Sequence, residues 1–88
     1  MRNFSFDSIV IDDLKTWLKN NPSLVKKIFE LLSDIDKDPF QGIGKPEALK
    51  YDLKGCWSRR ISQEHRLVYE VSTNGDIKVL SVHGHYEQ

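Results

Sequence analysis

The 88-residue sequence predicts one α+β domain, residues 1–88, in which an N-terminal strand and a helical hairpin pack on a mostly antiparallel sheet. Apolar residues first alternate with polar ones and then recur at helical spacing until about residue 38. Beyond that point the helical period disappears, and short apolar segments separated by turn residues follow. The expected order of elements is therefore β-α-α-β-β-β-β.

The N-terminal part should contain one short strand and two helices. Residues 2–6 alternate between apolar and polar side chains, as in a strand. A helix from about Ser8 should end at an Asn-Asn-Pro sequence, in which Asn21 can cap the second helix and Pro22 can take its first position. The second helix should end near Asp38. The predicted apolar stripes are Val10, Leu14, Trp17 and Leu18, then Val25, Ile28, Phe29, Leu32 and Ile35.

The sequence of the C-terminal part predicts a loop that is followed by strands. The expected segments are a glycine-containing loop over 40–47, strands over 51–53, 57–61, 66–71 and 77–83, and turns over 54–55 and 62–64. A further turn should lie at Asn74-Gly75, since this pair supplies the positive φ angles that a type I′ hairpin turn requires. These segments favour antiparallel pairing.

Composition excludes several classes of protein. The chain has no apolar run as long as a membrane span, no signal-peptide pattern, and one cysteine, so the cytoplasm is the expected location. The 13 basic and 13 acidic side chains balance, but residues 42–66 hold six cations and only three acids. This local excess favours a short contact with phosphates. The alternative is a chance bias of a solvated surface.

Side chains suited to metal-free RNA cleavage are spread along this part of the chain. Glu47 could accept a proton from a hydroxyl group, and Arg60 and Arg66 could donate hydrogen bonds to a phosphate. His85 could act as a general acid, while Tyr86 could stack on a base or bind the phosphate. Ordinary surface charge, strand salt bridges and an unstructured tail are the alternatives for these residues.

A zinc site is a further alternative. His83 and His85 would point to one face of a strand, where Cys56 or His65 could complete a ligand set. The chain has no CxxC or HExxH sequence, and the segment from Gly42 to Lys45 lacks the pattern of a nucleotide-binding P-loop. We therefore expect no metal and no cofactor.

Four ordered motifs resemble one known family. They are Pro39-Phe40-x-Gly42-x-Gly44-Lys45-Pro46-Glu47-x-Leu49, Leu53-x-Gly55-x-Trp57-Ser58-Arg59-Arg60-Ile61, Glu64-His65-Arg66-Leu67-Val68-Tyr69 and His85-Tyr86. Together they resemble the YoeB (Txe) branch of the RelE toxin superfamily over nearly the whole chain. The resemblance implies the RelE-like microbial RNase fold and a bacterial origin. It also implies a type II toxin that cleaves mRNA in the ribosomal A site without a metal.

The resemblance also implies roles and partners. Carried over by position, Glu47 is the general base, Arg66 the transition-state cation, His85 the general acid and Tyr86 the aromatic that positions RNA. Predicted supporting or RNA-binding residues are Lys45, Lys50, Arg59, Arg60 and Glu64. The implied partners are a YefM/Phd-like antitoxin, the ribosome with its mRNA, and a second copy of the chain in a homodimer.

The sequence departs from the family pattern at a few positions. Gly84 and Cys56 replace residues that are usually aromatic, and His83 stands where a Lys or Arg is common. Glu87 and Gln88 follow the Tyr that usually ends these proteins. A second interpretation is therefore a catalytically weakened relative that binds ribosomes or RNA and still binds antitoxin.

Overall fold

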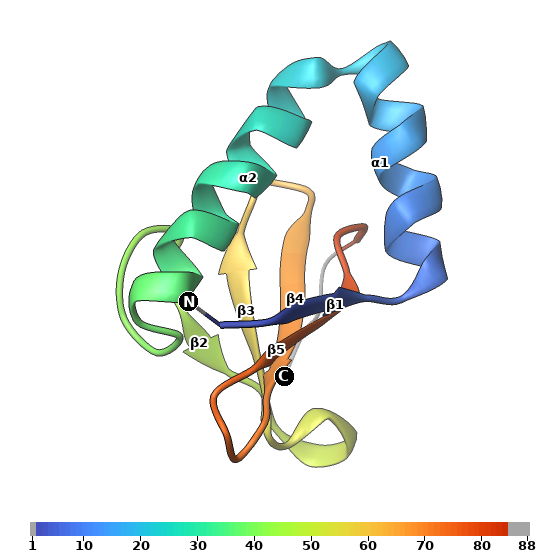
Figure 1. Ribbon diagram of the computed structural model, residues 1–88. Helices are drawn as coiled ribbons and strands as arrows, with labels where there is room; N and C mark the ends of the chain where they lie inside the picture. The colour runs from blue at the N-terminus through green and yellow to red at the C-terminus, as the bar shows by residue number, and fades with distance from the viewer. Residues whose placement is uncertain (1, 85–88) are drawn as a thin grey trace.

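A computed structural model, which describes residues 2–84, has the predicted α+β architecture (Figure 1). Its elements are β1 (Phe4–Phe6), α1 (Ser8–Asn20), α2 (Pro22–Lys37), β2 (Glu47–Ala48), a 3₁₀ turn (Tyr51–Leu53), β3 (Cys56–Arg60), β4 (Arg66–Val71) and β5 (Ile77–Ser81). The sheet order is β1-β5-β4-β3-β2. Among the described strands only the β1–β5 pair is parallel, so the mostly antiparallel sheet is confirmed.

The helical hairpin forms where the sequence predicts it. The N–H of Asn21 donates to the carbonyl of Trp17 at 2.7 Å and ends α1, and Pro22 begins α2. The predicted side-chain cap at Asn21 is wrong, because its amide oxygen accepts from the Ser23 hydroxyl instead of from a helix N–H. Figure 1 shows the two helices meeting at this turn as an inverted V.

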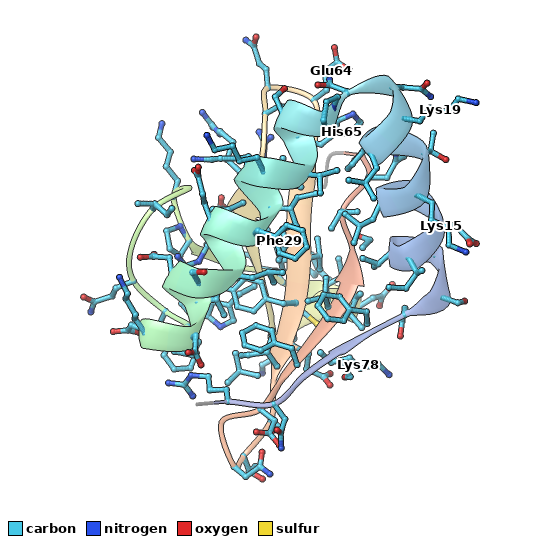
Figure 2. The ribbon with its side chains drawn as sticks, turned by 45° about the horizontal axis from the view of Figure 1, so that its top comes forward. Lys15, Lys19, Phe29, Glu64, His65 and Lys78 are labelled. Carbon is cyan, nitrogen blue, oxygen red and sulfur yellow. The ribbon has the colours of Figure 1, made fainter. Side chains whose placement is uncertain are left out.

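The main core lies between the helices and one face of the sheet. Its buried members are Val10, Ile28, Leu31, Ile35, Ile61, Leu67, Tyr69, Ile77, Val79 and Val82. Two predicted core residues are instead exposed, Leu18 at 60% and Phe29 (labelled in Figure 2) at 58%. Leu31 takes the place of Phe29, because the buried stripe of α2 runs through positions 28, 31 and 35.

A buried arginine network shapes the loop after α2. Arg59 has no exposed surface. Its five N–H groups reach the Tyr69 hydroxyl at 3.1 Å, the Asp34 carboxylate at 2.5 Å, and the carbonyls of Asp38 (2.6 Å), Gln41 (3.1 Å) and Ile43 (3.1 Å). The Tyr69 hydroxyl in turn donates to the Pro39 carbonyl at 2.6 Å. Loop carbonyls that would otherwise lack partners are thus held by one guanidinium group.

The network also sets the ionisation of its neighbours. Hydrogen bonds from the Ile43 N–H and from Arg59 lower the pKa of Asp34 below 3.8. Burial raises the pKa of Tyr69, so its hydroxyl stays neutral and can donate. Gly42 has φ +133°, and a Cβ there would overlap the Asp34 carboxylate, so only glycine fits this close approach.

Three local predictions need correction. Residues 51–53 form a 3₁₀ turn rather than a strand, since Leu53 and Lys54 donate to carbonyls three residues earlier. The turn at Asn74-Gly75 is present, but only Gly75 has positive φ and its N–H donates to Ser72, as in a type I turn with a glycine bulge. The last strand ends at Ser81, so His83 lies beyond it.

Candidate functional site

Three of the predicted site residues, Glu47, Arg60 and Arg66, lie on the sheet face opposite the helices. Side chains on a strand alternate between faces, and Trp57 and Leu67 pack into the core beneath the helices. Arg60 and Arg66 therefore point to the other face, where they form a directly opposed pair of β3 and β4. Glu47 joins them there, because it pairs with Ser58, which precedes Arg60 by two residues.

Glu47 lies in β2 at the edge of the sheet, not in the loop that the sequence predicts. The loop before it is fixed by Arg59 and by a 2.6 Å hydrogen bond from the Arg60 N–H to the Gly44 carbonyl. Within residues 2–84 the exposed carboxylate makes no hydrogen bond or ion pair. It is therefore open to accept a proton from a ligand.

Arg66 is half-buried and oriented by the β3–β4 turn. Its Nη1 donates to the carbonyls of Ser62 at 2.7 Å and His65 at 3.1 Å. Among the described residues, its Nε and Nη2 atoms have no hydrogen-bond partner and no carboxylate within salt-bridge distance. The salt bridge to Glu64 that the sequence allows is thus not found there. A guanidinium held on one side keeps donors for a phosphate on the other.

The spacing on this face suits a ligand between a base and a cation. Glu47 and Arg66 lie on strands that are two positions apart in the sheet, which corresponds to about 10 Å between the two strands. Long side chains can converge over that gap from either side. Lys50 and Glu64, both exposed, lie toward opposite ends of β3, and Figure 2 shows Glu64 near the end of α1.

A cation-lined hollow opens beside Arg60. It has a volume of about 460 Å³ and is lined by Lys27, Gly44, Lys45, Arg60, Ile61, Ser62 and Gln63. Sequence reasoning missed Lys27, because it lies on α2, far along the chain from the other cations. Its position one residue before the buried Ile28 places it beside the core-facing stripe of α2, and this was the available signal.

The position of Arg59 differs from the prediction. Although it is adjacent to Arg60, it points to the helix side, is fully buried, and uses all its N–H groups within the protein. Burial leaves Arg59 no surface for a direct RNA contact, so of the two roles predicted for it, RNA binding or support, only support remains: it holds the loop that leads to Glu47.

The final predicted residues lie only partly within the described structure. His85 and Tyr86 are outside the described residues. Gly84, immediately before them, is hydrogen-bonded to the His65 ring and to the Arg66 backbone. Within residues 2–84, no group of three His, Cys, Asp or Glu side chains is arranged to hold a metal ion, and no helix is long and apolar enough to cross a membrane.

This fold and motif order match a known family. A family model described as a YoeB-like toxin of a bacterial type II toxin–antitoxin system matches residues 6–86. The chain belongs to this family. The YoeB-like chain is 48% identical to toxin YoeB of Escherichia coli (strain K12) over 75 residues, which is 85% of this chain and 88% of that toxin.

Solved structures agree with this assignment. The YoeB-like chain is similar to the YoeB–YefM complex from Staphylococcus aureus, with a TM-score of 0.86, 48% identity, and coverage of 98% of this chain and 99% of that chain. It is also similar to the YoeB dimer from the same species, with a TM-score of 0.88, 46% identity, and coverage of 97% and 98%. The toxin fold predicted from the sequence is therefore confirmed.

Proposed function

We propose that this toxin is a ribosome-dependent mRNA endoribonuclease that cleaves in the A site without a metal and thereby inhibits translation. The observation that carries the proposal is the arrangement of Glu47, Arg60 and Arg66 on one open sheet face, without acidic partners for the two arginines among the described residues. A proton acceptor and permanent cations on opposite sides of a gap are what phosphodiester transfer requires.

In the proposed mechanism, Glu47 removes the proton from a ribose 2′-hydroxyl, whose oxygen attacks the adjacent phosphorus. Arg66 donates hydrogen bonds to the phosphoryl oxygens as their negative charge grows. His85 gives a proton to the leaving 5′-oxygen, and Tyr86 holds the RNA by stacking or hydrogen bonding. The P–O5′ bond breaks as the new P–O2′ bond forms, which leaves a 2′,3′-cyclic phosphate and a 5′-hydroxyl.

The remaining cations bind rather than react. Lys45 and Arg60, with Lys27 beside them, line the hollow next to the site and could hold a neighbouring phosphate. Lys50 and Glu64 would support the RNA at the two ends of β3. Because the whole chain is formally neutral, the ribosome must supply much of the substrate affinity and alignment. A ribosomal target also places the protein in the cytoplasm.

The proposed partners follow from the relatives. The YoeB–YefM complex of S. aureus supports a YefM/Phd-like antitoxin, and the YoeB dimer supports a homodimer. An acidic or apolar antitoxin segment could cover the cationic face and block RNA by charge and bulk. Removing that segment from the antitoxin should weaken binding and leave cleavage active.

The test is primer extension on a reporter mRNA in a purified translation system, with and without ribosomes. Wild type should produce ribosome-dependent cuts that Glu47→Ala and His85→Ala lose. Glu70→Ala is the matched control, since Glu70 is an exposed glutamate on the same sheet face and faces Cys56 instead of the site. Translation arrest without cuts would contradict the proposal and favour a relative that binds the ribosome without catalysis.

A further inference from the structure

The last described residues are tied to β4 by two hydrogen bonds. The Gly84 N–H donates to Nδ1 of His65 at 3.0 Å, and the Arg66 N–H donates to the Gly84 carbonyl at 2.9 Å. Both backbone groups of Gly84 are thus bonded to consecutive residues, His65 just before β4 and Arg66 at its start. Gly84 has φ +89°, a conformation that favours glycine. A glycine at this position, which is usually aromatic in the family, therefore suits the backbone conformation in which both hydrogen bonds form.

The His65 ring is itself held in place. It packs against the rings of Trp17 and His83, each with centroids 4.9 Å away. Its backbone N–H donates to the Ser62 hydroxyl at 3.2 Å, and its carbonyl accepts from Ile61 at 3.0 Å. Figure 2 shows His65 at the end of the molecule where α1 finishes. Because a helix and a turn hold the ring in place, its Nδ1 is a rigid acceptor for the Gly84 N–H.

The direction of the Gly84 bond defines the state of the ring. A backbone N–H can only donate, so Nδ1 must carry a lone pair and the proton of the neutral ring lies on Nε2. Other side chains could fill the volume of the ring, but few could also place an acceptor at this point. The contact therefore asks for a specific chemical group as well as for packing.

We propose that His65 is a positioning residue, whose Nδ1 fixes Gly84, the residue that directly precedes the proposed general acid His85 in the chain. The inference rests on the proposed function for its catalytic part. His85 follows Gly84 directly in the sequence, and both backbone groups of Gly84 are hydrogen-bonded. The same carbonyl contact links this anchor to Arg66, the proposed transition-state cation.

Loss of the anchor should lower the rate of the chemical step more than it changes substrate affinity. A misplacement of about 1 Å can reduce a rate about 100-fold, because the reacting groups no longer meet in a productive geometry. The proposed RNA contacts in the hollow come from α2, the loop and β3, and none of them involves His65. Tyr86, which is proposed to hold the RNA, also follows Gly84, so we expect kcat to fall by a larger factor than KM rises for the programmed ribosome.

Two substitutions separate the acceptor from the ring. His65→Phe keeps ring packing on Trp17 and removes Nδ1, whereas His65→Asn loses the ring and can place an amide oxygen near the position of Nδ1. His83→Phe is the matched control, because it removes a histidine from the same ring cluster and leaves the Gly84 bond intact. Thermal unfolding of each variant verifies that it folds.

The experiment combines hydrogen exchange of the Gly84 amide in the free protein with cleavage on programmed ribosomes. In His65→Phe, Gly84 exchange should become about tenfold faster, and kcat should fall by about 10- to 100-fold. In His65→Asn, both the Gly84 exchange rate and kcat should return most of the way to their wild-type values. His83→Phe should match wild type in both. A two-bond ¹H–¹⁵N spectrum should show the Nε2–H form of His65.

Unchanged Gly84 exchange in His65→Phe would overturn the inference, as would faster exchange together with a wild-type kcat. A larger loss in His65→Asn than in His65→Phe would also overturn it, because packing would then matter and the acceptor would not. If the wild-type protein does not cleave, the proposed function fails and the catalytic part of this inference fails with it. The exchange rates of the Gly84 amide would still decide whether His65 holds Gly84 in place.

Discussion

The arginines on the two faces of the sheet differ in burial and in hydrogen-bond partners. On the helix side, Arg59 is fully buried and surrounded by a carboxylate, a phenol and three carbonyls. On the open side, Arg60 is exposed, and neither it nor Arg66 has an acidic partner among the described residues. The oxygen atoms around a cation, rather than its residue type, therefore decide whether it maintains the fold or remains available to a phosphate.

Replacing Arg59 should have the largest effect on the fold. Arg59→Ala leaves Asp34 without its cation and frees the loop carbonyls, so the free energy of unfolding should fall by about 3–5 kcal/mol. Urea unfolding measures this change. Arg60→Ala is the matched control, and it should change stability by about 0.5 kcal/mol or less. Equal losses in the two variants would remove the distinction between the faces.

Asp34→Asn should weaken the same network by a smaller amount, about 2–3 kcal/mol, because the Asp34 side chain is 22% exposed and an amide can still accept one hydrogen bond. The effect should depend on pH. The folded-state pKa of Asp34 lies below 3.8, so its contribution is complete above that value and is lost as pH falls through the lower folded pKa.

Urea unfolding of both proteins between pH 6 and the acid limit tests this dependence. The stability gap between wild type and Asp34→Asn should stay constant down to about pH 4 and close below it. Other carboxylates titrate in both proteins, so the difference isolates Asp34. A gap that is constant throughout would show that its charge is not what stabilises the loop.

Much of this arrangement follows from the sequence, but the burial of Arg59 does not. Hydrophobic period predicts both helices and the three longer strands because each pattern is local. Period-two alternation also places Arg59 and Arg60 on opposite faces, and the shared face of Trp57 and Arg59 was a signal that one arginine is buried. Four of its five oxygen partners come from residues 34–43, and only the folded chain brings those residues to β3.

The contact between His65 and Gly84 could not be predicted for a similar reason. The two residues are 19 positions apart, and they meet because β5 returns alongside β4. Sequence similarity identifies the candidate residues at the site, whereas strand register places Glu47, Arg60 and Arg66 on one face. Register depends on pairing across strands, and a pattern within one strand does not define it.

A smaller effect should come from the cation-lined hollow between α2, the loop and the end of β3. Lys27→Ala removes one of its three cations, so ribosome binding should weaken, and the slope of log affinity against log salt should decrease by about one. Lys26→Ala is the matched control, because Lys26 is exposed on α2 and does not line the hollow. Identical slopes for the two variants would exclude a specific phosphate contact at Lys27.

A last prediction concerns Cys56, because part of the sheet face opposite the helices is covered at this residue. Its thiol is buried with Leu49 and Val68, and burial, together with the charge of Glu70, raises its pKa above 9.0. Because the thiolate is the reactive form, a disulfide reagent should modify folded protein far more slowly than urea-unfolded protein at pH 7. Equal rates in the two states would contradict this packing.

The central claim is that the open sheet face performs the chemistry, and Arg66→Ala tests it most directly. Its single-turnover cleavage rate on programmed ribosomes should be measured beside its free energy of unfolding. We predict a rate about 10²- to 10³-fold lower, with stability reduced by about 1 kcal/mol or less, because only hydrogen bonds to turn carbonyls are lost. A wild-type rate in the folded variant would contradict the account.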